Sequence, residues 1–202
     1  MTFQVPDIVK FLWKDVVWRM NPAEKVIYLT FDDGPNPQIT PQVLDILDEH
    51  GVKATFFCVG DNVRKYPDTF SEVTSRGHAV GNHTFNHIKG FKFSTADYVA
   101  NVQKASEYIE SRILRPPHGQ IKFSQVRALK KNYKIIMWDL ITFDYDKNVT
   151  PEQISRIVKK QTRNGSIVVF HDSLKAERNV LNVLPVALNF WKNQGYDIRL
   201  LT

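Results

Sequence analysis

Hydrophobic residues follow two patterns that alternate along this chain. Short apolar runs rich in β-branched and aromatic residues recur at intervals, and between them apolar residues return every three or four positions, as on one face of a helix. The runs predict seven strands, at residues 26–31, 53–59, 79–81, 113–115, 134–140, 166–170 and 197–201. The intervening stretches predict helices at about 40–50, 67–76, 95–112, 124–131, 151–163 and 180–193.

This alternation predicts one α/β domain with parallel strands and the helices outside them. The chain has 202 residues, 43% of them hydrophobic and 24% charged, which is enough for one well-buried core of ordinary globular composition. We expect residues 26–202 to form this domain. Residues 1–25 are expected to be an N-terminal segment that packs against it, with one helical face made of Ile8, Phe11, Leu12 and Val16.

Three hydroxyl residues are expected to begin helices as N-caps, because their side chains can accept a hydrogen bond from the first helical turn. They are Thr40, Ser94 and Thr150. A proline follows Thr40 and Thr150 directly, and proline suits the first helical position.

The net charge of +6 suggests an anionic environment or partner, such as a cell-wall polymer, a membrane surface or nucleic acid. The basic residues are scattered, however, which favours an ordinary solvated surface, and no nucleic-acid-binding module is recognisable. The single cysteine, Cys58, excludes an intrachain disulfide framework. No run approaches the ~20 apolar residues of a membrane span, and the N-terminus is a poor signal peptide. We therefore expect a cytoplasmic protein, or an extracellular or wall-associated one if a leader was removed.

Two adjacent carboxylates, Asp32 and Asp33, follow the first predicted strand in the stretch LTFDDGP. The Gly34-Pro35 pair ends that strand abruptly, so the same residues also fit a plain polar turn. Because neighbouring residues of a strand point to opposite sides, a turn at this place could give the two acids separate roles. The remainder of the chain favours the chemical interpretation over the plain turn.

A possible metal site follows the third predicted strand, where His83 and His87 stand four residues apart. Histidines at this spacing share one face of a helical turn and can bind one ion. A carboxylate from the Asp32-Asp33 pair would complete a set of two imidazoles and one acid. That set suits catalytic zinc and equally a non-haem iron oxygenase.

Three further polar clusters follow later strands: the stretch RPPHG with Arg115, the stretch FDY with Asp144, and His171-Asp172 directly after an apolar run. Each alone fits a structural role, such as a surface ion pair or a helix cap. Barrels and open α/β sheets carry their active sites at the C-terminal ends of strands, so clusters repeated at four strand ends indicate a catalytic site.

The motifs TFDDGP, HTFNH, RPPHG, FDY and VVFHD stand here in the order typical of one known family. From about Val26 to its C-terminus the chain resembles the polysaccharide deacetylases of carbohydrate esterase family four, which share a domain with nodulation-factor chitooligosaccharide deacetylases. The resemblance implies a distorted (β/α) barrel with fewer than eight strands, which agrees with the seven strands predicted above.

Site roles follow from the resemblance. It implies that Asp33, His83 and His87 bind a divalent metal, usually zinc, with cobalt or another divalent ion as alternatives. It also implies that Asp32 is the general base for a metal-bound water, paired with Arg115, and that His171 is the general acid, tuned by Asp144. The remaining implied roles concern the substrate: an oxyanion donor at the backbone N–H of His118, which follows Pro117, and a small acetyl pocket walled by Tyr145 and Val169.

Two positions depart from the family pattern, which usually has tyrosine where His118 stands and tryptophan at Tyr145. The first change should be tolerated, because the expected donor is in the main chain, whereas the second should alter the shape of the acyl pocket. The metal and acid–base positions are all intact. His50 and His78 match no motif and are expected to be structural.

The sequence therefore predicts a metal-dependent hydrolase that removes N-acetyl groups from an amino-sugar polymer or oligomer. Peptidoglycan N-acetylglucosamine is the first expected substrate and a chitin-like oligomer the second. Three alternatives stay open: a hydrolase of a non-sugar linear or cyclic amide, an iron oxygenase, which the strand pattern disfavours, and a catalytically silent carbohydrate-binding homologue. The sequence leaves the oligomeric state open.

Overall fold

The computed structural model describes residues 13–201. Within these residues nine strands pair in parallel. Their order in the sheet is β1-β6-β5-β4-β3-β2-β8-β7, and β9 pairs with β2 off this path. The strands are β1 (Val16–Val17), β2 (Val26–Asp32), β3 (Thr55–Cys58), β4 (Ala79–Asn82), β5 (Ile113–Leu114), β6 (Lys134–Ile136), β7 (Leu140–Ile141), β8 (Ile167–His171) and β9 (Asp197–Ile198).

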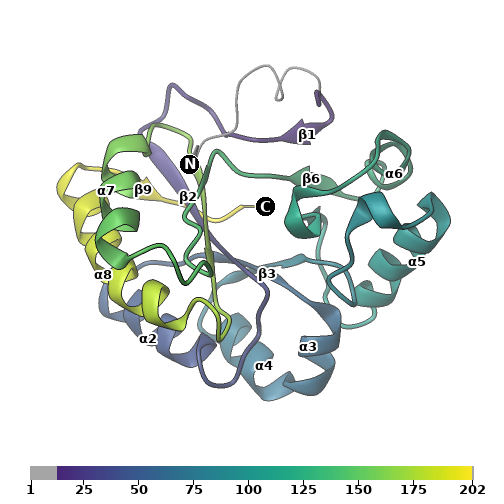
Figure 1. Cartoon of the computed structure of the whole chain (residues 1–202), viewed down its shortest axis with the longest axis horizontal. Coiled ribbons are helices and arrows are strands. Elements are labelled where there is room, and N and C mark those ends of the chain that lie inside the picture. The colour runs from purple at the N-terminus through teal and green to yellow at the C-terminus, as the bar shows by residue number, and fades with distance from the viewer. Residues whose placement is uncertain (1–12, 202) are drawn as a thin grey trace.

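Helices surround the curled sheet on three sides. They are α2 (Thr40–Glu49), α3 (Gly60–Lys65), α4 (Pro67–Ser75), α5 (Thr95–Ser106), α6 (Phe123–Leu129), α7 (Pro151–Gln161) and α8 (Glu177–Asn193), with 3-10 turns at Gly90–Lys92 and Pro117–Gly119. Figure 1 shows α7, α8 and α2 on the left, α4 and α3 below, and α5 and α6 on the right. The predicted arrangement of parallel strands inside a layer of helices is confirmed.

The stretch from β6 to β7 closes the sheet on itself. It pairs with β5 through β6 and with β8 through β7, and only residues 137–139 separate the two strands. Over those residues the chain changes neighbours: Met137 N–H donates to the carbonyl of Val17 (2.7 Å), and Asp139 N–H donates to that of Ile167 (3.0 Å). The single strand predicted at 134–140 is therefore wrong, because its two ends pair with different strands.

The N-terminal segment takes part in this closure. Val16 and Val17 pair with Ile135 and Ile136, and Met20 N–H donates to the carbonyl of Gly165 (2.8 Å). The helical face predicted for this segment falls largely on residues 1–12, outside the described residues. Val16, its last member, is in a strand, so the helix is wrong at that position, because the β6 edge offers unpaired backbone groups there. The domain boundary at residue 26 stays a prediction.

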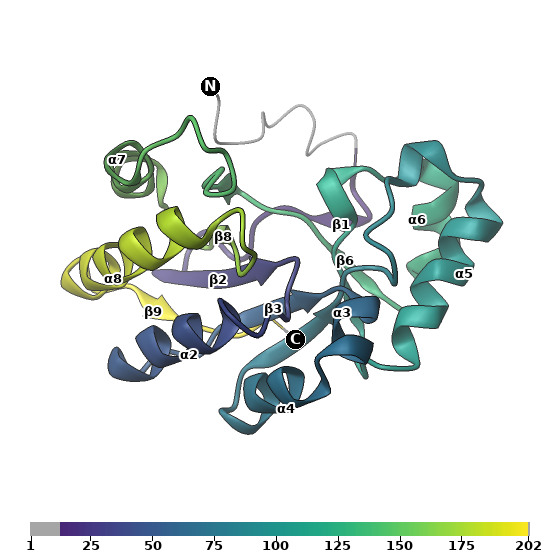
Figure 2. The same cartoon turned by 60° about the horizontal axis from the view of Figure 1, so that its bottom comes forward.

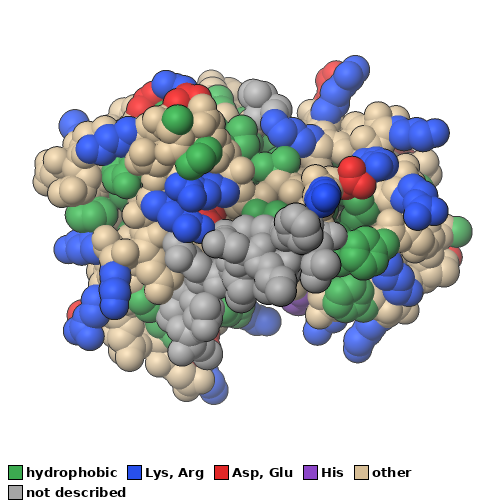
Figure 3. Space-filling view, turned by 90° about the horizontal axis from the view of Figure 1, so that it is seen from above, with side chains coloured by type: hydrophobic (Ala, Val, Ile, Leu, Met, Phe, Trp, Pro, Cys, Tyr) green, Lys and Arg blue, Asp and Glu red, His purple; other side chains and the backbone are tan. Residues whose placement is uncertain are grey.

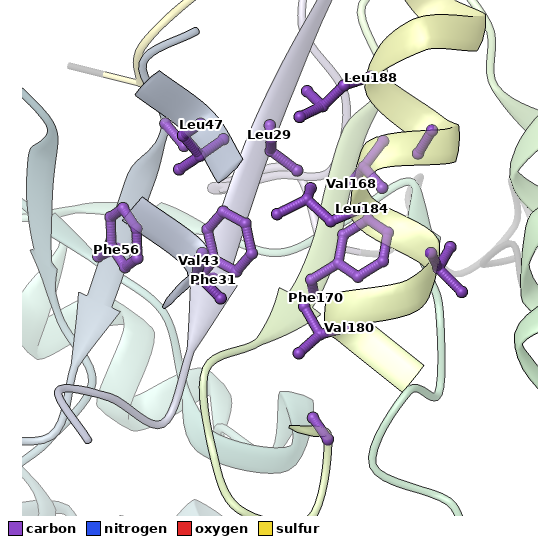
Figure 4. Close-up of a cluster of buried hydrophobic side chains, with 14 of the residues drawn as sticks. Leu29, Phe31, Val43, Leu47, Phe56, Val168, Phe170, Val180, Leu184 and Leu188 are labelled. Carbon is purple, nitrogen blue, oxygen red and sulfur yellow. The ribbon is translucent and has the colours of Figure 1, made fainter. Parts of the chain in front are cut away.

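The main hydrophobic core lies between the sheet and the helices on its left flank. Figure 4 shows the side chains of β2 and β8, such as Phe31 and Phe170, between α8 on one side and α2 on the other. Figure 2 shows α8 and α2 on the same side of the molecule, with α5 and α6 on the opposite side. Alternate residues of β2 therefore face the helices, whereas Thr30 and Asp32 face the interior of the sheet.

Several helix boundaries differ from the prediction, and α8 for example begins three residues before the predicted position 180. Thr40 is the first residue of α2 and not its N-cap; its hydroxyl accepts the N–H of Asn36 (2.8 Å) and donates to Asp172 (2.6 Å). The helix predicted at 95–112 ends at Ser106, because the chain turns at residues 107–108 and brings β5 beside β4.

Other local features agree with the sequence. Ser94 and Thr150 cap α5 and α7 by accepting the N–H groups of Asp97 and Gln153. Helix α3 was not predicted.

Lys and Arg side chains are spread over the face shown in Figure 3 and do not form one basic patch. Among residues 13–201, no helix is both long and apolar enough for a membrane span.

Candidate active site and metal centre

One cleft of about 990 Å³ collects most of the predicted site residues. Its lining includes Asp32, Asp33, His83, His87, His118, Tyr145 and His171. Parallel strands bring these residues together, because their carboxyl ends meet at one edge of the sheet. Asp32 ends β2 and pairs in register with His171, which ends β8. The cluster predicted from four separate strand ends is thus one site.

Asp33, His83 and His87 form a group that can bind a metal ion. Among the described residues it is the one group of three or more such side chains whose ligand atoms lie within 4.8 Å of one another. Asp33 Oδ1 lies 3.0 Å from His87 Nε2 and 3.6 Å from His83 Nε2. Burial raises the pKa of the Asp33 carboxyl, but hydrogen bonds from both histidines outweigh burial and hold this pKa well below its usual range.

Hydrogen bonding leaves the correct nitrogen of His83 free for a metal. Its Nδ1–H donates to the carbonyl of Arg115 (2.8 Å), so in the neutral ring the lone pair is on Nε2, the atom directed at Asp33. A metal ion would take the place of the Nε2 proton that donates to Asp33 in the charged ring. Two imidazoles and one carboxylate, with positions left for water and substrate, are the donor set of catalytic zinc sites. The residues present therefore fit a divalent ion.

The two histidines lie on a loop and not on the helical turn that their spacing suggested. Residues 83–89 are not helical, and Thr84 and His87 adopt positive φ angles of 62° and 54°. These left-handed conformations are uncommon for residues with a Cβ. The loop is held by Asn101, whose Oδ1 accepts the N–H of Phe85 (2.8 Å). The spacing pointed to two histidines that do lie together, but the geometry that brings them together comes from the loop.

Asp32 and Arg115 form a buried ion pair at the floor of the cleft. Arg115 is completely buried, and its Nη1 donates to Asp32 Oδ1 at 2.6 Å. The same guanidinium donates to Thr30 Oγ1 (2.8 Å) and to the carbonyl of Met137 (3.0 Å), and it stacks 4.0 Å from the ring centre of Phe57. Burial lowers the pKa of Arg115, although the Asp32 carboxylate acts against that change.

Removing this guanidinium should destabilise the protein strongly. We expect Arg115→Met to lower the free energy of unfolding by about 3–5 kcal/mol, because it leaves the Asp32 carboxylate buried without its partner. Urea denaturation of the metal-free protein measures the change. In an Asp32→Asn background the same substitution should cost clearly less, since no charge is then stranded. An equal cost in both backgrounds would contradict the pairing.

His171 is held by Asp144 through two hydrogen bonds. Its Nδ1–H donates to Asp144 Oδ1 (2.7 Å), and its backbone N–H donates to Oδ2 (2.8 Å). Burial lowers the pKa of His171, but the Asp144 carboxylate outweighs it and the pKa rises to about 9. Asn179 holds the loop beneath by donating to the carbonyls of Asp144 (2.8 Å) and Val149 (3.1 Å). The imidazole is therefore positively charged at neutral pH with Nε2 as its second proton-bearing atom.

The predicted substrate residues divide into two groups. His118 and Tyr145 line the cleft: the ring of His118 lies 4.6 Å from that of His87, and Tyr145 meets His171 edge-on at 4.8 Å. Pro117 and Val169 are buried and are not part of the cleft lining. Val169 pairs with Thr30 on one side and Ile141 on the other, and Ile141 does line the cleft.

Several cleft residues were not predicted. Trp138, Phe143 and Leu174 add apolar surface, and Asn62 adds an amide. Asp172, beside His171 in the sequence, is not part of the cleft lining; it accepts the N–H of Gly34, in the turn after Asp33, and the hydroxyl of Thr40. Of these residues Trp138, a half-buried tryptophan next to a strand, was the one that the sequence could have indicated as part of a binding cleft. The other residues stand in no local sequence pattern that indicates a site. His50 and His78 lie outside the cleft lining, in line with the structural roles expected for them.

Comparison with known sequences gives a consistent result. The polysaccharide deacetylase family model matches residues 19–136. A peptidoglycan-N-acetylglucosamine deacetylase of Bacillus cereus is 33% identical over 188 residues, covering 90% of this chain and 88% of that protein. A second protein of that name from the same organism is 35% identical over 160 residues, covering 76% of this chain and 57%, little more than half, of that protein.

Solved structures share the fold. A peptidoglycan N-acetylglucosamine deacetylase in complex with an N-hydroxybenzamide superposes with a TM-score of 0.87 at 27% identity, over 95% of this chain and 94% of that one. A Bacillus anthracis protein described as a pseudoenzyme of carbohydrate esterase family four superposes with a TM-score of 0.80 at 25% identity, over 91% of this chain and 66% of that one. The predicted distorted (β/α) barrel is confirmed.

Proposed function

The chain belongs to the polysaccharide deacetylase family, and we propose that it is a metal-dependent hydrolase that removes N-acetyl groups from amino-sugar polymers. Peptidoglycan N-acetylglucosamine is the first proposed substrate, because two of its relatives are named for that activity, and chitin-like oligomers are the second. The observation that carries the proposal is the convergence of a two-histidine, one-carboxylate group with an Asp–Arg pair and an Asp–His pair in one cleft.

Asp33, His83 and His87 are the proposed metal ligands, and zinc is the proposed ion because this donor set is typical of catalytic zinc. When bound, such an ion polarises an amide carbonyl and lowers the pKa of a water molecule. The hydrogen bond to the Arg115 carbonyl already orients the His83 ring for metal binding. The neutral form of the ring is the one that binds metals.

Asp32 is the proposed general base. The Arg115 guanidinium holds its Oδ1, so the second carboxylate oxygen is left to accept a proton from the attacking water. Thr30 and the carbonyl of Met137 fix the guanidinium in turn. The base thus has a set orientation before substrate binds, which is the condition for efficient proton transfer.

His171 is the proposed general acid. The Nδ1–H group of His171 donates a hydrogen bond to Asp144, so Nε2–H is the group that can protonate the leaving amine. A general base and a general acid must carry opposite protonation states at the same pH. Here each has its own ion-pair partner: Arg115 pairs with Asp32, and Asp144 pairs with His171. The backbone N–H of His118, in a left-handed turn at the cleft, is the proposed donor to the developing oxyanion.

The pKa of His171 offers a direct check on this acid. We expect nuclear magnetic resonance titration of the metal-free protein to give a value near 9. In Asp144→Asn the pKa of His171 should fall well below the wild-type value, because the Asp144 carboxylate no longer offsets burial and Asp33 and Asp32 alone still raise it. Because the folded-state pKa is raised, the stabilisation from this pair is full below pH 6.5 and is lost as the pH rises through about 9. Identical titration curves in the two proteins would contradict the assignment.

Acetate release tests the function as a whole. The chelated protein, then the protein with zinc, cobalt or iron(II) restored, is incubated with N-acetylglucosamine oligomers and with peptidoglycan. Metal-dependent release supports the proposal and ranks the substrates. Release from simple acetylated amides alone would favour the non-sugar hydrolase. Metal binding and sugar binding without any release would favour a catalytically silent homologue, which the pseudoenzyme among the solved relatives makes a specific alternative.

A further inference from the structure

The two adjacent carboxylates at the end of β2 face the same cleft, although consecutive strand residues point to opposite sides. Asp32 faces the interior of the sheet, where it meets Arg115. A regular strand would direct Asp33 the same way as Phe31, toward the helices of the main core. Asp33 instead adopts a φ of 80°, and its carboxylate lies beside His87 and His83. This left-handed turn is what places both acids in one site.

Left-handed backbone is unfavourable for a residue with a Cβ, so other contacts must hold it. Two side chains do so from either side of the Asp33 peptide. Asn62 of α3 donates through Nδ2 to the carbonyl of Asp33 (2.8 Å). Asp172 accepts the N–H of Gly34 through Oδ1 (3.0 Å). In addition, the carbonyl of Gly34 accepts the N–H of Val59 (2.9 Å).

Asp172 is itself built into a closed arrangement. It is 1% exposed, and its second oxygen accepts the hydroxyl proton of Thr40 (2.6 Å). A Cβ on Gly34 would come within 2.0 Å of Asp172 Oδ2, so only glycine fits between the carboxylate and the turn. Asp172 N–H also donates to the carbonyl of Asp32 (3.2 Å), which ties it to the strand that bears the base.

We propose that Asn62 and Asp172 are positioning residues for Asp33: they hold its backbone in the left-handed conformation that turns its carboxylate from the helix layer into the cleft. The inference rests on the proposed function in one respect, that Asp33 binds the metal. Asp172 follows the proposed general acid directly, so one short stretch of β8 supplies the acid and supports the metal ligand. Neither positioning residue touches the reacting atoms through these contacts.

Metal affinity in the absence of substrate is the decisive measurement. Competition with a chromophoric chelator gives the dissociation constants for Zn²⁺ and Co²⁺, and the visible spectrum of bound Co²⁺ reports its ligand geometry. In Asp172→Ala, which removes both acceptor oxygens, and in Asn62→Ala we expect affinity to fall by about 10–100-fold, the usual effect of losing a group that orients a ligand. Because both side chains support the same peptide, the double variant should lose less than the product of the two single effects.

Asp139→Ala is the matched control. Asp139 is likewise a completely buried carboxylate, and it accepts Ser166 Oγ (2.9 Å) and Arg163 Nη2 (2.6 Å). Its partner Ser166 lies five residues before His171, about 16 Å away along the chain direction of β8. The control should lower the urea midpoint and leave metal affinity within about threefold of wild type.

Two results would overturn the proposal: folded Asp172→Ala and Asn62→Ala proteins that bind metal as wild type does, or an Asp139→Ala protein that loses as much affinity as they do. If Asp172→Ala does not fold, Thr40→Val removes just one of the bonds to Asp172 and should give a smaller loss of affinity. If the wild-type protein binds metal normally but releases no acetate, the sugar-deacetylase assignment is wrong, and the proposal about Asn62 and Asp172 still stands. Failure of the wild-type chain to bind metal would end both.

Discussion

Asp32→Asn is expected to lower the rate of acetate release by about 10²–10⁴-fold, the usual contribution of a general base. Asparagine has nearly the same shape and can still accept the hydrogen bond from Arg115, but it cannot take the proton of the attacking water. The loss should therefore appear in kcat, with metal content and the far-ultraviolet circular dichroism spectrum unchanged. Steady-state kinetics on N-acetylglucosamine oligomers measure the effect.

Asp45→Asn is the control for that experiment. Asp45 is an exposed carboxylate of α2 that pairs with Arg76 (2.7 Å), outside the cleft lining. Its loss should leave kcat unchanged, since surface ion pairs contribute little. Wild-type rates in Asp32→Asn would exclude Asp32 as the base. A rate loss that accompanies loss of bound metal would instead assign the effect to the metal centre.

His83→Ala should abolish metal-dependent activity, the second large effect. It removes one of three proposed ligands, so metal affinity should fall by more than the 10–100-fold expected for a group that only orients a ligand. The Arg115 carbonyl also loses its donor, which should weaken the support of the Asp32–Arg115 pair. Metal content after dialysis and acetate release with zinc restored measure the two consequences separately.

His50→Ala serves as the matched histidine control. Its Nδ1 bonds to the carbonyl of Ile46 (2.8 Å) at the end of α2, away from the cleft lining. We expect metal content and activity to stay at wild-type levels in this variant. Retained stoichiometric metal in His83→Ala would remove His83 from the ligand set. Loss of metal in both variants would indicate a general loss of structure.

The sequence by itself determined the alternation of strands and helices, two of the helix caps and the candidate site residues. The two hydrophobic periods separate strands from helices because local backbone geometry dictates which side chains share a face. The caps Ser94 and Thr150 act within their own first turns, so they too could be predicted. The catalytic candidates were found because motifs at strand ends converge whenever the strands are parallel. None of these inferences needed a contact between distant residues.

Tertiary structure alone decided how the site is assembled. Residues 137–139 close the barrel because their two ends meet different strands, which no local pattern encodes. The left-handed turn at Asp33 depends on Asn62 and Asp172, which stand 29 and 138 residues away from their partners. Such conformations are locally unfavourable and persist only where surrounding contacts hold them. The sequence shows which groups are present, and the packed fold decides that the two neighbouring carboxylates Asp32 and Asp33 face one cleft.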